Sequence, residues 1–175
     1  ESYGGNVSGN HGRSDYWVVK LDAGGNITWQ KCLGGNRYDM AFSVHQTADE
    51  GYIVAGQSDS NNGNVSGNNG GYDFWVVKLD TSGNITWQKS LGGSDNEFAF
   101  ALYPTNDGGY VVAGPGRSTD GDVTGNHGDY DYWVVKLDAS SDIQWQKSLG
   151  GSSYDRPLFV SQTADGGYLV AGDSE

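Results

Sequence analysis

The sequence of 175 residues is long enough for one domain with a substantial core, and its 29 glycines, three prolines and 13% aromatic residues indicate a globular chain with many tight turns. Its formal net charge of −12, with only ten lysines and arginines, argues against nucleic-acid binding, which needs clustered basic side chains. No apolar run reaches the roughly 18 residues of a membrane-spanning helix, so membrane insertion is not expected.

One eight-residue stretch occurs three times, at residues 15–22, 73–80 and 131–138, and each time it reads Asp, an aromatic residue, Trp-Val-Val-Lys-Leu-Asp. The copies lie 58 residues apart. A fixed period of this size is the sequence signature of repeat architectures. We therefore interpret residues 1–175 as a single repeat domain, with repeats at approximately 1–58, 59–116 and 117–174.

Each repeat opens with a polar loop, which in the first copy covers residues 1–12. Its density of Gly, Asn, Asp and Ser predicts a surface loop without regular structure. The recurring stretch follows and alternates apolar side chains on both faces, which predicts a strand covered on both sides. A turn at residues 23–26 leads into a second, outer strand at residues 27–33, and the two strands form a hairpin.

A third strand is predicted at about residues 38–47, with Phe42 and Val44 pointing inward. A glycine turn at residues 48–51 leads into a fourth strand at residues 52–56. No segment shows helical periodicity. Four short antiparallel strands per repeat are the content of one β-propeller blade, so the sequence predicts an all-β protein with three blade equivalents. A β-solenoid is the competing interpretation, but its rungs are shorter and are not built from hairpins.

Two motifs carry a resemblance to known proteins. The segment Leu-Asp-Ala-Gly-Gly-Asn-Ile-Thr-Trp-Gln at residues 21–30 is similar to the tryptophan-docking motif of quinoprotein-type propellers. The Val-Ser-Gly-Asn-His-Gly and Gly-Gly-Tyr-Val-Val-Ala-Gly elements, at residues 7–12 and 108–114, resemble propeller-like repeats of secreted or surface proteins of bacteria and archaea.

This resemblance implies a blade register that is offset from the repeats: a half blade at 1–35, blades at 36–93 and 94–151, and a half blade at 152–175. It implies no quinone site, and we expect no organic cofactor.

The chemically reactive residues form no repeated catalytic pattern. His11 and His127 correspond to Asn69, and Cys32 corresponds to serines in the other repeats. We therefore expect no catalytic residue and no enzyme activity; the alternative is an enzyme with an unrepeated site in a propeller channel. The six tryptophans stand on strands with alternating apolar residues, which favours packing between blades over ligand stacking.

The polar loops are the candidate binding sites, because their polar density exceeds what a turn needs. The residues expected to be displayed to a ligand are Asn6, Asn10, His11, Asn64, Asn68, Asn69, Asp122, Asn126 and His127. In the third loop Asp120, Asp122, Thr124 and Asn126 place oxygens at alternate positions with glycine between, which is compatible with calcium. The alternative is a loop whose side chains bond its own backbone.

These observations predict a non-enzymatic binding or structural module, secreted or at the cell surface and acting in adhesion, that displays its loops to a glycan or a surface protein. A purely mechanical repeat of a larger assembly is the alternative. Because three blades cannot close a ring, self-association is also expected: two copies joined head to tail would make a six-bladed ring of about 37 kDa, twice 18.7 kDa. Further repeats of a longer chain could close the ring instead.

Overall fold

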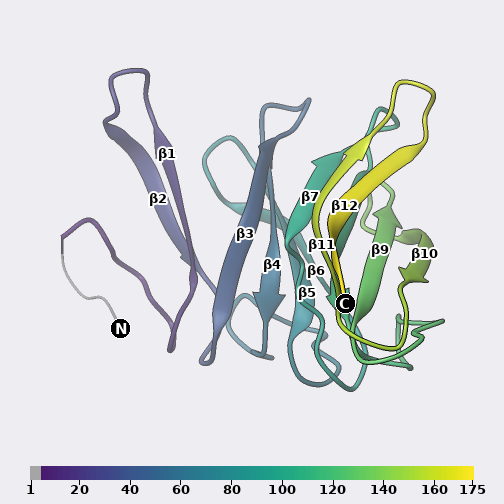
Figure 1. The fold of residues 1–175 in the computed structure, drawn as a ribbon. Coiled ribbons are helices and arrows are strands. Elements are labelled where there is room, and N and C mark those ends of the chain that lie inside the picture. Colours follow the sequence, from purple (N-terminus) through teal and green to yellow (C-terminus); the bar gives the residue numbers. More distant parts are fainter. Residues whose placement is uncertain (1–4) are drawn as a thin grey trace.

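The computed structural model describes residues 5–175, and this part of the chain is all-β, with no helix (Figure 1). No segment within it could therefore cross a membrane as a helix. The strands are β1 (Tyr16–Leu21), β2 (Ile27–Leu33), β3 (Asp39–Gln46), β4 (Tyr52–Ser58), β5 (Asp73–Leu79), β6 (Ile85–Leu91), β7 (Ala101–Pro104), β8 (Tyr110–Gly116), β9 (Asp131–Leu137), β10 (Ile143–Leu149), β11 (Asp155–Gln162) and β12 (Tyr168–Ser174).

The strands form four antiparallel sheets in which neighbours in space are neighbours in the chain. Two sheets have four strands, β3-β4-β5-β6 and β7-β8-β9-β10, and two have only two strands, β1-β2 and β11-β12. Figure 1 shows the sheets following one another from the β1–β2 hairpin to the β11–β12 hairpin. No closed ring is present within residues 5–175, so closure of a propeller stays a prediction.

The hairpin between β5 and β6 shows why the repeated turn sequence bends the chain. The Asp80 carboxylate accepts hydrogen bonds from the backbone N–H groups of Ser82, at 2.9 Å, and Asn84, at 2.8 Å. Gly83 takes the left-handed φ of 77° that this turn requires. Ser141 adopts a φ of 72° at the equivalent place, so the third repeat makes the same turn without glycine.

The core lies between successive sheets, in three clusters of buried apolar side chains. Every residue of β5 is buried, as expected for a strand covered on both faces. Trp75 and Trp133 are fully buried, whereas their equivalent Trp17 is 46% exposed. Each buried tryptophan packs against an aromatic ring of the preceding sheet, Trp75 against Tyr16 and Trp133 against Phe74.

The prediction that Phe42 and Val44 point into the core is wrong for this chain. Their exposed fractions are 50% and 57%, whereas Leu102, the equivalent of Val44, is only 2% exposed. The cause is the neighbouring sheet. The face of β3 is opposed by the two-stranded β1–β2 sheet, which lacks the strands that would cover these side chains.

Candidate functional site

The polar loops lie at one edge of the sheets, where β4 leads into β5 and β8 leads into β9 (Figure 1). The loop at residues 59–72 is held against the segment that joins β2 to β3. Asn64 Oδ1 accepts the N–H of Gly34 at 3.2 Å, and Asn62 Oδ1 accepts the N–H of Asn36 at 2.9 Å. These amides therefore fix the loop to the preceding sheet.

The loop at residues 117–130 uses carboxylates for the same contacts. Asp120 Oδ1 accepts the N–H of Ser94 at 2.7 Å, and Asp122 Oδ2 accepts the N–H of Gly92 at 3.3 Å. The Thr124 hydroxyl contacts the Gln146 amide. Asn126 Oδ1 accepts the N–H of Gly128 at 2.8 Å.

The four proposed calcium ligands thus bond neighbouring backbone and side-chain groups instead of converging on one point. Among residues 5–175 no group of three or more His, Cys, Asp or Glu side chains could hold a metal ion. These residues do not fit a calcium cage as they stand, because the ion would have to displace the N–H donors. Calcium binding stays a prediction.

The histidines of the first and third loops face a buried aspartate. His11 Nδ1 lies 2.7 Å from the carboxylate of Asp15, and His127 Nδ1 lies 2.6 Å from that of Asp131. Asn10 and Asn126 each cap the turn beside the histidine through a neighbouring glycine N–H. These loop residues stabilise the start of a strand, and their polar atoms are largely occupied.

Asn69 stands where the other loops have histidine. Its backbone N–H donates to Asp73, and Asp73 Oδ1 is buried without a hydrogen-bond partner. Burial, together with the negative charges of Glu97 and Asp122, raises the pKa of Asp73 to about 7. The middle repeat therefore contains a buried carboxyl with a raised pKa that lacks a histidine partner.

A polar pocket of about 400 Å³ opens between the loop 59–72 and the segment before β3. It continues into a second pocket of about 420 Å³ that shares Asn36, Arg37 and Asp59. The residues around the two pockets are Arg13, Asn36, Arg37, Tyr38, Asp59, Asn61, Asn62, Asn68, Asn69 and Gly70. We call this region the polar cleft.

Two of the chain's four arginines meet in the polar cleft. The Arg37 side chain is 65% exposed and lies 3.9 Å from Asp59, so this ion pair is loose. The Arg13 guanidinium lies 5.1 Å from the centre of the Tyr38 ring and donates to the Tyr38 hydroxyl at 3.2 Å. The cleft thus combines cationic, aromatic and amide groups in a strongly acidic protein.

The equivalent place in the next repeat has a different arrangement of charges. Arg117 occupies the position of Asp59, and Asp95 occupies that of Arg37, so the ion pair is reversed. Arg117 lies 3.6 Å from Asp95 and 3.2 Å from Asp129, and its guanidinium is 5.7 Å from the Tyr130 ring. The Arg117 guanidinium is thus engaged by two carboxylates and an aromatic ring, whereas Arg37 has one loose ion pair.

The sequence prediction for ligand display overlaps the cleft only in part. It named Asn68 and Asn69, which line the cleft, and Asn64, which braces the loop behind it. Asn6 lies in the first loop and is exposed, and Asp122, Asn126 and His127 belong to the loop at 117–130. Arg13, Arg37, Tyr38 and Asp59 were missed. The arginines were the available signal, since neither is repeated.

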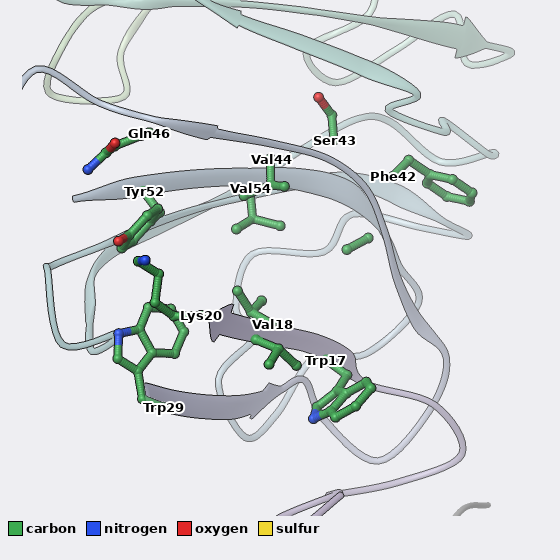
Figure 2. A pocket seen from close by; sticks show the side chains of 12 residues that line it. Trp17, Val18, Lys20, Trp29, Phe42, Ser43, Val44, Gln46, Tyr52 and Val54 are labelled. Atoms are coloured by element: carbon green, nitrogen blue, oxygen red, sulfur yellow. The ribbon is translucent and has the colours of Figure 1, made fainter. Parts of the chain in front are cut away.

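An apolar pocket of about 640 Å³ lies between the β1–β2 hairpin and the β3–β4 hairpin (Figure 2). One wall carries Trp17, Val18, Lys20 and Trp29, and the other carries Phe42, Ser43, Val44, Gln46, Tyr52 and Val54. This is the place at which Phe42 and Val44 remain uncovered. We call it the end groove.

The fold and the cleft define a class of protein: an all-β protein of repeated antiparallel sheets with polar connecting loops. No family model matches the chain. The chain is similar to the regulatory protein FlaEY of Caulobacter vibrioides, with 32% identity over 145 residues. The similarity covers 76% of this chain and 14% of the length of FlaEY.

Proposed function

We propose that this chain is a non-enzymatic, propeller-type binding module, secreted or at the cell surface, and that its ligand is a glycan carrying an acidic sugar. The polar cleft carries this proposal. Arg37 offers an exposed guanidinium for a carboxylate, and Tyr38 offers an aromatic edge beside it. Asn61, Asn62 and Asn69 line the wall from which amides would bind hydroxyl groups.

A binding role is favoured over catalysis because the groups in the cleft lack a nucleophile paired with a base. The His–Asp pairs, in which only the aspartate is buried, hold the backbone of their own loops. The carboxylate of Asp59 is engaged by the N–H of Tyr38 at 2.7 Å, which leaves the arginine as the accessible charge. An enzyme with an unrepeated site is the second candidate, and a glycosidase assay on the ligand that is bound would detect it.

A propeller fits the repeated sheets because each four-stranded sheet packs face to face on the next. Such packing places equivalent loops at one edge, where several could contact one partner. A similarity that spans only 14% of FlaEY is what a module used within longer proteins would produce. A role in a larger mechanical assembly is compatible with the same packing.

The test is a glycan array that contains neutral and acidic sugars, probed with the parent protein and with Arg37→Gln. We expect binding to acidic glycans and at least a tenfold loss in the variant, since a charged hydrogen bond contributes about 1.5–3 kcal/mol. Arg117→Gln is the matched control, because that arginine is already held by two aspartates. Equal binding by parent and Arg37→Gln, or no binding to any sugar, would refute the proposed ligand.

Calcium is tested in the same preparation. If the loop at 117–130 binds calcium, the ion raises the melting temperature of the parent and does not raise that of Asp120→Asn/Asp122→Asn. An equal response of both proteins would exclude that loop as the calcium site.

A further inference from the structure

The exposed apolar side chains gather at the two ends of the row of sheets. Trp17, Leu21, Ile27, Phe42 and Val44 lie on β1, β2 and β3, and Leu149, Leu158, Phe159 and Leu169 lie on β10, β11 and β12. Among residues 5–175 the other exposed large apolar residues are two tyrosines, Tyr38 and Tyr103. Apolar surface concentrated in this way marks an interaction site.

The repeat shows what covers these positions elsewhere. Leu21 is 47% exposed, whereas its equivalents Leu79 and Leu137 are fully buried. Leu169 is 62% exposed, whereas its equivalents Ile53 and Val111 are fully buried. In the two four-stranded sheets, which we call complete, β5 pairs with β4 and β9 pairs with β8. β1 is the equivalent of β5 and β9, and among the described residues it has no such partner.

We propose that the β11–β12 hairpin of a second copy of this chain docks on the free edge of β1 and fills the end groove. The proposal rests on the propeller-type packing proposed above and extends it to self-association. The contact would form twice in the dimer. Each time, β11 and β12 of one copy would join β1 and β2 of the other copy to make a four-stranded sheet.

The register follows from the two pairings already present. Ala55 pairs with Val76 in one sheet, and Ala113 pairs with Val134 in the next. The same alignment places Ala171 of β12 opposite Val18 of the second copy. Phe159 and Leu169 lie on the face of the hairpin that is exposed here, and this face would enter the end groove against Val44, Tyr52 and Val54.

An ion pair provides a charge test of this register. Lys78 Nζ lies 2.8 Å from Asp49, and Lys136 Nζ lies 2.8 Å from Asp107. Both lysine side chains are almost fully buried, with exposed fractions of 8% and 1%. In each case the pairing of two strands, β4 with β5 or β8 with β9, brings the lysine to the aspartate in the turn before the first of them.

Lys20 and Asp165 are the equivalent residues, and they lie at opposite ends of the row. Lys20 Nζ donates to Leu21 O, as Lys78 and Lys136 donate to the next carbonyl. Asp165 accepts the Thr163 hydroxyl and the N–H of Gly167, as Asp49 and Asp107 accept the equivalent groups. Each half of a third ion pair is therefore already in its bonding geometry, and docking would join them.

The experiment is light scattering with charge reversal. The parent should have a mass of about 37 kDa, twice 18.7 kDa. Lys20→Asp alone and Asp165→Lys alone should weaken the dimer by about 100-fold, because each places like charges together at a buried site. An equimolar mixture of the two variants should recover the dimer, since both of its contacts then join opposite charges. Lys20→Asp/Asp165→Lys in one chain should recover it as well.

Lys89→Asp on β6 is the matched control, because it makes the same charge change in a complete sheet and should leave the mass unchanged. A parent protein that stays at 18.7 kDa at all concentrations overturns the proposal. The proposal also fails if the two single variants dimerise as strongly as the parent. Recovery by the mixture cannot arise from misfolded chains, so a folding defect is recognised. Light scattering reports association alone and the glycan array reports ligand binding alone, so either proposal can fail without the other.

Discussion

Replacing Asp73 by asparagine should stabilise the protein at neutral pH, although the residue is fully buried. Burial and the nearby Glu97 and Asp122 charges raise the pKa of Asp73 from 3.8 to about 7. The folded protein therefore binds this proton more tightly than the unfolded chain does. Its stabilising effect is complete below about pH 4 and is lost as the pH rises to about 7.

The magnitude follows from the two pKa values. One pKa unit corresponds to about 1.4 kcal/mol, so ionising Asp73 in the folded state costs roughly 4 kcal/mol at most. The asparagine variant avoids this cost. Its amide also places an N–H donor near Glu97, since the carboxylates of Asp73 and Glu97 both flank the α-carbon of Gly92. We expect a gain in the free energy of unfolding of about 2–4 kcal/mol at pH 8 and almost none at pH 4.

The assay is urea unfolding of parent and variant at a series of pH values between 4 and 8, about the range over which the carboxyl titrates. Asp131→Asn is the matched control in the third repeat. Asp131 accepts a hydrogen bond from the backbone of His127 at 3.0 Å and lies 2.6 Å from its ring nitrogen, so its removal should destabilise the protein. A difference between Asp73→Asn and parent that does not grow with pH would refute the reasoning, and so would a loss of stability at pH 8.

Two further predictions concern the complete sheets. Asp107→Asn leaves the buried Lys136 ammonium without its carboxylate and should lower the free energy of unfolding by about 3 kcal/mol in urea titrations at pH 7; no measurable loss would mean that Leu137 O and Gln144 satisfy the lysine. Gly114→Ala would drive a methyl group into the Phe98 carbonyl oxygen and should lower the free energy of unfolding by about 3 kcal/mol or more. Gly108→Ala has open space around the new methyl group but keeps a φ of 82°, so it should lower the free energy of unfolding by about 1 kcal/mol. Equal melting temperatures for the two glycine variants would contradict the packing of the segment before β7 against β8.

The positions of the strands were predictable because a period of two and a glycine turn are local signals. The predicted outer strand at residues 27–33 coincides with β2. The repeat itself made the prediction stronger, since three copies of one pattern average out local irregularities. The polar cleft was not predictable, because Arg37 and Asp59 are separated by a strand pair and meet only after β3 and β4 have paired.

Exposure was the other quantity that local sequence could not supply. Trp17 and Trp75 occupy nearly identical sequences, yet one is 46% exposed and the other is fully buried. The difference arises because Trp75 packs against Tyr16 of the preceding sheet, whereas among residues 5–175 no sheet precedes that of Trp17. The expectation for Phe42 and Val44 failed for a related reason, because the sheet that faces them has only two strands.

Where one residue of a contact differs between two repeats, its partner differs as well. This indicates that contacts rather than single residues are preserved. Asp39 accepts the hydroxyl group of Ser58, whereas the equivalent pair in the next repeat is Glu97 with Gly116. The longer acid makes up for the missing hydroxyl by accepting the N–H of Ser118 at 2.9 Å. The ion pair of the polar cleft follows the same rule, because both partners differ in the next repeat, where Asp95 and Arg117 reverse it.

The same rule bears on the two ends of the chain. Phe159 stands where the other repeats have Ser43 and Ala101, and no partner within residues 5–175 covers it, since it is 70% exposed. An enlarged apolar side chain at a free face would only reduce solubility if nothing packed on it. In the dimer proposed above, Phe159 would enter the end groove of about 640 Å³ at the other end. The same proposed contact between copies would join Lys20 to Asp165, which keep the geometry of a buried ion pair at these two ends.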